Sequence, residues 1–208
     1  ADTAFYKNNK GEYYARGKNP DGGEDSEDDL LRVISFVDAP GHETLMAVMI
    51  SGASIMDGAL LLVAANESCP QAQTREHLAA LQIAGIENIV VVQNKVDLVS
   101  KERAIESYQE ILSFIEGTIA EGSPIVPVSA HHDVNLDMLI QAIEDTIPSP
   151  SLDSEDKGLM YVARSFDVNR PGLRPNKLRG GIIGGSIVEG SFSVGDSILI
   201  APGRRISE

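Results

Sequence analysis

Apolar and polar positions follow one another in blocks that predict alternating strands and helices over the first two thirds of the chain. Short apolar runs rich in β-branched residues predict buried strands at residues 33–37, 58–65, 89–92 and 125–128. Between these runs, apolar residues recur at helical spacing, which predicts helices at about 44–56, 71–84, 101–116 and 135–147. Strands that alternate with helices indicate an α/β domain, with a mostly parallel sheet covered on both faces.

Four residues mark helix ends in this pattern. Ser100 and Asn135 are suited to cap the amino ends of the third and fourth helices, Gly85 to close the second, and Pro148 to stop the fourth. In the third helix, the apolar positions at helical spacing are Ile105, Tyr108, Leu112 and Ile115. In the fourth helix, the apolar stripe comprises Leu136, Leu139, Ile140, Ile143 and Ile147.

The pattern divides the chain into four parts. Residues 1–30 are polar and predict an irregular surface segment, and residues 31–148 carry the α/β pattern. Residues 149–158 are rich in proline, serine and charge, as in a linker. From residue 159 to 208, helical periodicity gives way to short strands separated by glycines, which predicts the start of an antiparallel β-barrel.

Composition narrows the class of protein. The 208 residues carry a net charge of −14 and a single cysteine, Cys69, so an internal disulfide is excluded and a reducing, cytoplasmic setting is favoured. No apolar run is long enough to cross a bilayer, and residues 1–10 have no signal-peptide character, so we expect no membrane partner. An acidic chain is also repelled by nucleic acid at long range, unless a basic patch lies locally on its surface.

Such a basic segment occurs between residues 164 and 179. Five cations are opposed there by Asp167 alone: Arg164, Arg170, Arg174, Lys177 and Arg179. One interpretation is a solvated loop whose cations balance nearby acids. The other is a contact for tRNA or an acidic partner, because the planar guanidinium group of Arg binds phosphate through two parallel hydrogen bonds.

Polar side chains also follow three of the predicted strands directly. Asp38-Ala-Pro-Gly41-His42 follows the first strand, Asn94-Lys95-Val96-Asp97 the third, and Ser129-Ala130 the fourth. The carboxyl ends of strands in open α/β sheets are where ligands bind. A carboxylate such as that of Asp97 can accept two parallel hydrogen bonds from the N1–H and amino group of guanine, a donor pair that adenine lacks.

These three loops, in this order, resemble the GTPase superfamily. Longer blocks resemble the translational GTPases: residues 38–42, GASIMDGA at 52–59 and QTREH at 73–77. Within this group of GTPases, three further blocks resemble the gamma subunits of archaeal and eukaryotic translation initiation factor 2. They are ANESCP at 65–70, QNKVDLV at 93–99, and ARSFDVNRPG at 163–172. The resemblance runs from about residue 31 to 203 and extends into the barrel with GGIIGGSI at 180–187.

The resemblance implies roles for the loop residues. Asp38 would hold a magnesium ion, through water, Gly41 would sense the γ-phosphate, and His42 would position the attacking water. The alternative for His42 is a turn histidine without a catalytic task. Guanine of GTP or GDP would be bound by Asn94, Lys95, Asp97, Ser129 and Ala130.

Two departures from the family pattern alter the expectation. The 208 residues contain no Gly-x-x-x-x-Gly-Lys-Ser/Thr, so we expect the phosphate loop, the first strand and the first switch to precede Ala1. Residues 1–32 contain no cysteine where the family usually has a zinc knuckle, so no zinc is expected. We also expect the barrel to continue beyond residue 208.

The function that the resemblance implies is GTP-dependent binding of methionyl initiator tRNA and its delivery to the small ribosomal subunit, with slow GTP hydrolysis. The alpha and beta subunits of the same factor would be the protein partners. One alternative is an elongation-type GTPase that carries another aminoacyl-tRNA. Another, for these 208 residues, is a module that binds subunits or tRNA and does not hydrolyse nucleotide.

Overall fold

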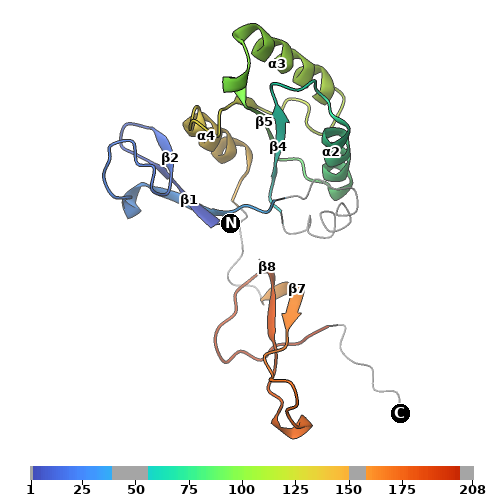
Figure 1. Cartoon of the computed structure of the whole chain (residues 1–208). Coiled ribbons are helices and arrows are strands. Elements are labelled where there is room, and N and C mark those ends of the chain that lie inside the picture. Colours follow the sequence, from blue (N-terminus) through green and yellow to red (C-terminus); the bar gives the residue numbers. More distant parts are fainter. Residues whose placement is uncertain (1, 39–55, 150–157, 202–208) are drawn as a thin grey trace. The chain divides into compact units, whose positions relative to one another are not determined.

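The computed structural model describes residues 2–38, 56–149 and 158–201, and the chain divides into two compact units, 1–149 and 150–208 (Figure 1). The first unit contains the predicted parallel sheet. Its strands are β4 (Ala59–Ala64), β5 (Ile89–Asn94) and β6 (Ile125–Pro127), in that spatial order and parallel throughout. The strand predictions at 58–65, 89–92 and 125–128 are confirmed.

Three helices cover this sheet: α2 (Ala72–Ala84), α3 (Lys101–Ile115) and α4 (Leu136–Thr146). Successive side chains of a strand point to opposite faces, so β5 has apolar residues for both. Ile89 and Val91 pack in one cluster with residues of α2 and α3, whereas Val90 and Val92 pack towards α4. Figure 1 shows α2 and α4 on opposite sides of β4 and β5. The predicted α/β architecture with helices on both faces is confirmed.

The predicted helix ends are partly confirmed. Gly85 closes α2 in a left-handed conformation (φ 71°), and the Ser100 hydroxyl accepts a hydrogen bond from the backbone N–H of Arg103. Asn135 is the N-cap residue of α4, as predicted, but its side chain forms no capping hydrogen bond. Asn135 is itself left-handed (φ 58°), and its Nδ2 donates instead to the carbonyl of Pro127, at 2.8 Å.

The buried face of α3 differs from the predicted stripe. Ser107, Ile111 and Ile115 face the core, whereas Ile105 and Leu112 are exposed. The helical spacing of the apolar residues therefore did not identify the buried face of α3. The core contacts a face of this helix that is rotated from the predicted stripe. In α4, by contrast, all five residues of the predicted stripe are buried or half-buried.

The prediction that residues 1–30 are irregular is wrong for residues 2–7 and 13–15, which form strands. The segment contains β1 (Asp2–Lys7) and β2 (Tyr13–Ala15), and with β3 (Leu30–Ser35) these strands form an antiparallel sheet in the order β2-β1-β3. The apolar residues of β1 are used on both faces. Phe5 packs against Ile140 and Ile143 of α4, and the Tyr6 ring stacks on that of Tyr14 with 5.1 Å between centroids.

The segment around β3 also differs from its prediction. The strand ends at Ser35 rather than at residue 37, and it is not buried on both faces, because Val33 is 59% exposed and Val37 70%. The physical reason is its position: among the described residues, β3 pairs with β1 alone and β4 pairs with β5 alone. The helix predicted at 44–56 lies almost wholly outside the described residues.

The second unit contains β7 (Leu159–Phe166) and β8 (Ile182–Glu189), which pair in antiparallel fashion. The loop between them includes a 3-10 turn, η5 (Pro175–Lys177). This hairpin agrees with the predicted start of an antiparallel β structure after the linker, of which residues 150–157 lie outside the described part. None of the described helices is long and apolar enough to cross a membrane.

Candidate functional site

The loops that follow β5 and β6 are joined by the side chain of Asn94. Its Oδ1 accepts hydrogen bonds from the backbone N–H of Lys95, at 2.7 Å, and from that of Ala130, at 3.2 Å. The backbone N–H of Val96 donates to the carbonyl of Val128, at 3.3 Å. Two segments far apart in the sequence are thus fixed side by side at the carboxyl edge of the parallel sheet.

Asp97 is held by the second of these loops. The buried hydroxyl of Ser129 donates to its carboxylate, and this hydrogen bond is the main reason that the pKa of Asp97 lies below its usual range. The same Ser129 oxygen accepts from the backbone N–H of His132, at 3.4 Å, and His132 Nε2 lies 3.8 Å from Asp97 Oδ2. The carboxylate is therefore kept ionised at neutral pH while it stays accessible at the surface.

The backbone of both loops is strained. Lys95 (φ 62°), Asp133 (φ 55°) and Asn135 (φ 58°) have left-handed conformations, and they are the non-glycine residues of the described chain that do. Each such residue costs of order 1 kcal/mol or more, and these conformations cluster at ligand sites, where the surrounding structure enforces them. Their restriction to these two loops marks this edge of the sheet as the candidate site.

The sequence did not identify all residues of this site. It predicted Asn94, Lys95, Asp97, Ser129 and Ala130, which the structure brings together, but not His132 or Asp133. Asp133 forms an exposed ion pair with Lys18 of the segment between β2 and β3, at 2.6 Å. The tolerance of Asn and Asp for left-handed backbone was the available signal at residues 133 and 135.

Asp38 is not joined to these loops by any hydrogen bond or ion pair among the described residues. It lies three residues beyond the end of β3 and is exposed. Gly41 and His42 lie outside the described residues. In the described part of the chain, no three His, Cys, Asp or Glu side chains are close enough together to hold a metal ion.

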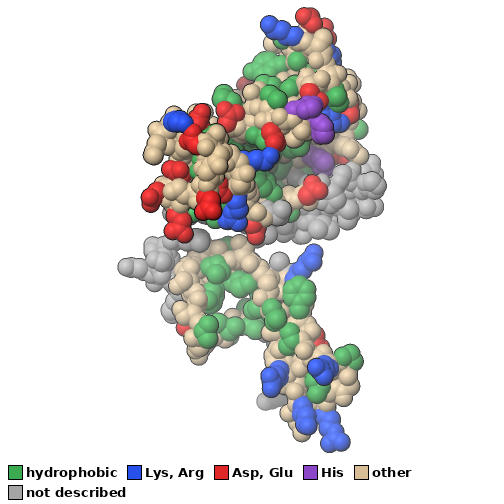
Figure 2. Space-filling model, turned by 60° about the vertical axis from the view of Figure 1, so that its left-hand side comes forward, with side chains coloured by type: hydrophobic (Ala, Val, Ile, Leu, Met, Phe, Trp, Pro, Cys, Tyr) green, Lys and Arg blue, Asp and Glu red, His purple; other side chains and the backbone are tan. Residues whose placement is uncertain are grey.

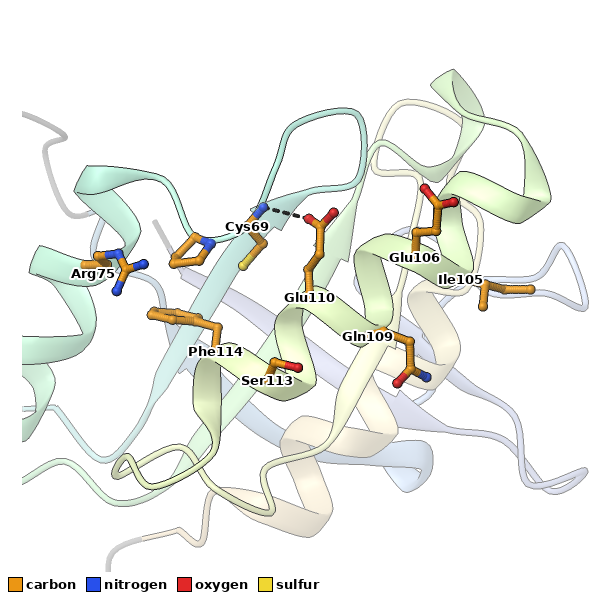
Figure 3. Close-up of a pocket in the computed structure, with 9 residues that line it drawn as sticks. Cys69, Arg75, Ile105, Glu106, Gln109, Glu110, Ser113 and Phe114 are labelled. Carbon is orange, nitrogen blue, oxygen red and sulfur yellow. Dashed lines mark hydrogen bonds between the residues drawn. The ribbon is translucent and has the colours of Figure 1, made fainter.

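A separate groove of about 710 Å³ lies between the start of α2 and α3 (Figure 3). The Glu110 carboxylate in its wall accepts from the backbone N–H of Cys69, at 2.8 Å, and from Arg103, at 2.6 Å. The Arg75 guanidinium lies 6.0 Å from the centre of the Phe114 ring. None of the predicted site residues lines this groove, so it does not belong to the candidate site.

Chemically, the candidate site offers an ionised carboxylate, beside a loop that the hydrogen bond from Ala130 to Asn94 fixes, and the aliphatic stem of an exposed lysine. An ionised carboxylate accepts hydrogen bonds only, so the Asp97 carboxylate can pair with adjacent N–H donors. The extended stem of Lys95 can cover an apolar ring face. This set fits the edge and face of a guanine base.

Comparisons with known proteins agree with this chemistry. Residues 27–149 match the family described as elongation factor Tu GTP binding domain. The chain is 58% identical over 206 residues to translation initiation factor 2 subunit gamma of Thermoplasma acidophilum, covering 98% of this chain and 49% of that protein. It is 66% identical over 174 residues to the subunit of the same name from Aeropyrum pernix, covering 84% and 42%.

A solved structure shares the fold. Translation elongation factor SelB from Methanococcus maripaludis, in complex with the GTP analogue GPPNHP, matches with a TM-score of 0.62 and 29% identity, over 76% of this chain and 34% of that chain. The resemblance to translational GTPases, and to the gamma subunits in particular, is confirmed. The chain spans about half the length of the curated relatives it matches or less. It has the α/β GTPase fold and belongs to the elongation factor Tu GTP-binding domain family.

Proposed function

We propose that Asp97 reads guanine in this protein. The observation that carries the proposal is the joint placement of Asn94, Asp97 and Ala130 at one sheet edge, with Asp97 ionised and hydrogen-bonded by Ser129. The carboxylate would accept from the guanine N1–H and amino group, while Lys95 lies along the ring face and Ser129 and Ala130 fix the loop. An adenine base would leave the carboxylate unpaired, which disfavours ATP.

On the phosphate side, the assignments rest on the motif at residues 38–42. Asp38 would hold magnesium through water, Gly41 would approach the γ-phosphate through its backbone N–H, and His42 would position water. GTP would supply the phosphoryl group whose transfer to water is the reaction. Since this transfer depends on positioning and charge stabilisation, it requires the phosphate loop that the 208 residues lack.

We infer that the protein acts in translation initiation. The relatives that are 58% and 66% identical are named translation initiation factor 2 subunit gamma, which supports this inference over an elongation-type function. By this similarity, the protein would bind methionyl initiator tRNA in the presence of GTP and deliver it to the small ribosomal subunit in the cytoplasm. The alpha and beta subunits of the same factor would be its partners, and hydrolysis would be slow.

The test of guanine selection is Asp97→Asn in a protein that joins these 208 residues to the phosphate-binding segment expected ahead of them. Asparagine presents an N–H donor, so selectivity should move from GTP towards xanthosine triphosphate, whose ring carries an oxygen in place of the amino group. Asn88→Asp, at a half-buried position directly before β5 and at the opposite end of that strand from Asp97, is the control and should leave the preference unchanged. Unaltered guanine selectivity in Asp97→Asn would mean that Asp97 does not select guanine.

A second measurement distinguishes a nucleotide switch from a module that only binds partners. The 208-residue chain is titrated calorimetrically with magnesium-GDP, and with magnesium-ADP as control. We expect no binding, because most phosphate affinity comes from the backbone amides and lysine of the phosphate loop. Tight, guanine-selective binding would mean that these residues hold the nucleotide without that loop.

A further inference from the structure

The loop that follows β6 forms a closed turn over residues 129–134. The backbone N–H of Val134 donates to the carbonyl of Ser129, at 3.0 Å, and the N–H of Ser129 donates to the carbonyl of Val134, at 3.2 Å. The N–H of His132 donates to the same Ser129 carbonyl, at 3.3 Å. The outer end of this closed turn is therefore joined directly to Ser129, whose hydroxyl donates to the carboxylate of Asp97.

The outer end of the closed turn is held by an ion pair. Asp133 precedes Val134 directly and has a left-handed backbone (φ 55°), a conformation that persists where the surrounding structure enforces it. Its Oδ2 lies 2.6 Å from the Nζ of Lys18. Among the described residues, Lys18 is the cation that pairs with Asp133. The pair thus holds the strained residue from outside the turn.

Lys18 extends from a backbone that is itself fixed. Its N–H donates to the carbonyl of Ala15 at the end of β2, at 2.9 Å, and the N–H of the preceding Gly17 (φ 74°) donates to the Asp25 carboxylate, at 2.8 Å. The sheet of β1 and β2 packs on α4 through Phe5, and Figure 1 shows both strands beside this helix. Because α4 follows the closed turn in the chain, Lys18 and the turn share one support.

The choice of partner by Lys18 is notable because many acids lie near it in the sequence. Residues 21–29 alone contain six Asp and Glu, and acidic side chains predominate on the face of the first unit that Figure 2 shows. Lys10 pairs with one of these acids, Asp21. Lys18 pairs instead with Asp133, which is 115 residues away in the sequence. This ion pair therefore connects the segment between β2 and β3 to the candidate site.

We propose that Lys18 is a positioning residue for the guanine base, and that its ion pair with Asp133 slows the release of guanine nucleotide. Lys18 acts through the closed turn: the pair holds Asp133, and the bridge from Val134 to Ser129 then keeps the Ser129 hydroxyl on Asp97. A loop that is held in place before binding loses less conformational freedom when the ligand binds. The inference rests on the proposed reading of guanine by Asp97.

The test measures release of fluorescently labelled GDP from the protein that joins these 208 residues to the phosphate-binding segment. Lys18→Met should accelerate release about twofold to fivefold at low salt, the range expected for an ion pair between exposed side chains. Lys18→Arg keeps the charge and should release GDP at the rate of the unmodified protein. At about 1 M salt, where such charges are screened, Lys18→Met should release GDP at that rate too.

The matched control is Lys10→Met, which makes the same change in net charge and also breaks an ion pair between exposed side chains. It should leave the release of GDP unchanged. Equal acceleration by Lys10→Met and Lys18→Met would overturn the proposal, because the effect would then come from net charge alone.

A double-mutant cycle tests whether the two residues act as a pair. Asp133→Asn removes the charge but keeps a residue type that tolerates the left-handed backbone. It should accelerate release as much as Lys18→Met does, and the double variant should release GDP no faster than either single variant. Additive effects would mean that Lys18 and Asp133 act independently, which contradicts the proposal.

Hydrogen exchange of the 208-residue chain tests the closed turn without nucleotide. The amide of Val134 should exchange about twofold to fivefold faster in Lys18→Met and should not change in Lys10→Met. Unaltered exchange at Val134 or unaltered release of GDP in Lys18→Met would overturn the inference, even if Asp97→Asn shifts the base preference as expected. If Asp97→Asn instead leaves guanine selectivity unaltered, the proposed function fails, whereas the response of Val134 to Lys18→Met does not depend on it.

Discussion

Arg32 of β3 and Glu144 of α4 form an ion pair, with 2.8 Å between Arg32 Nε and Glu144 Oε1. The two side chains are each 17% exposed, and the Arg32 guanidinium also donates to the carbonyls of Ile143 and Ile147 at the end of α4. One side chain thus donates to the carbonyl of Ile147, adds a second donor to the carbonyl of Ile143, which already accepts from the Ile147 N–H, and pairs with the acid of the helix. It ties the strand that leads to Asp38 to the last helix of the first unit.

We expect Arg32→Met to lower the free energy of unfolding of the first unit by about 2–4 kcal/mol, because it leaves the half-buried Glu144 carboxylate and the Ile147 carbonyl without their Arg32 donors. Arg32→Lys keeps the charge but loses the fork, so its effect should be intermediate. Urea unfolding followed by the helical circular dichroism signal measures both.

The control for this prediction is Lys10→Met. Lys10 pairs with Asp21, but both side chains are largely exposed, and such pairs contribute about 0–1 kcal/mol. If Arg32→Met lowered the free energy of unfolding no more than Lys10→Met does, the contact between β3 and α4 would stabilise the unit no more than an exposed ion pair.

The fold was predictable where the apolar pattern within a single helix or strand indicates which of its residues are buried. The apolar run 89–92 supplies both faces of β5, and the stripe of α4 is buried as its spacing predicts, against the parallel sheet and β1. It was not predictable in residues 1–30, where Phe5 and Tyr14 stand among polar residues. Their burial depends on contacts with α4 and with each other's strands, which are distant in the sequence.

Residues of the candidate site were predictable where a short sequence motif assigns a role to each of them. Asn94 and Asp97 were predicted from the Asn-Lys-x-Asp pattern of the GTPase superfamily, which directly follows a buried strand. The contact of His132 with Asp97 was not, since adjacent histidines in a loop carry no spacing signal and their directions depend on the left-handed backbone at Asp133. The assignments of Asp38, Gly41 and His42 stay predictions.

Asn94→Ala should loosen the loop after β6 without unfolding the sheet. The variant removes the acceptor of the Ala130 N–H, and we expect amide hydrogen exchange at Ala130 to accelerate by about tenfold, the equivalent of one hydrogen bond of roughly 1.4 kcal/mol. Asn94→Asp keeps an acceptor oxygen and should retain much of the protection.

Asn88→Ala is the matched control for this measurement, because Asn88 donates to the carbonyl of Asp57 at the opposite end of β5. Protection at Ala130 should not change in this variant. Unaltered exchange at Ala130 in Asn94→Ala would mean that the two loops are held by the backbone alone.

Cys69 should react slowly with thiol reagents in the folded protein. Burial, followed by the negative charge of Glu110, raises the pKa of its thiol to about 11. Relative to a free cysteine with a pKa near 9, the thiolate fraction at pH 8 falls about a hundredfold, and alkylation by iodoacetamide should slow in proportion. The same chain in urea should react at the rate of a free cysteine, and equal rates in both conditions would contradict the raised pKa.

Ser129→Ala should produce a loss of stability that depends on pH. The Ser129 hydroxyl is the main cause of the lowered pKa of Asp97, so its removal should move that pKa back towards the ordinary value, as a carboxylate NMR titration would show. A carboxyl group whose pKa is lower in the folded state stabilises the protein above its unfolded pKa, and this contribution disappears as pH falls through the folded pKa. The loss in Ser129→Ala should therefore be largest near neutral pH and should shrink below about pH 4.

Ser107→Ala separates this effect from the loss of any buried hydroxyl. Ser107 is as buried as Ser129, but its Oγ has no hydrogen-bond partner among the described residues. Its replacement removes an unsatisfied polar group, so stability should stay the same or increase, equally at every pH. A parallel pH dependence in both variants would show that the carboxylate of Asp97 takes no stabilisation from Ser129. Asp97 would then reach its ionised state at neutral pH without help from the second loop.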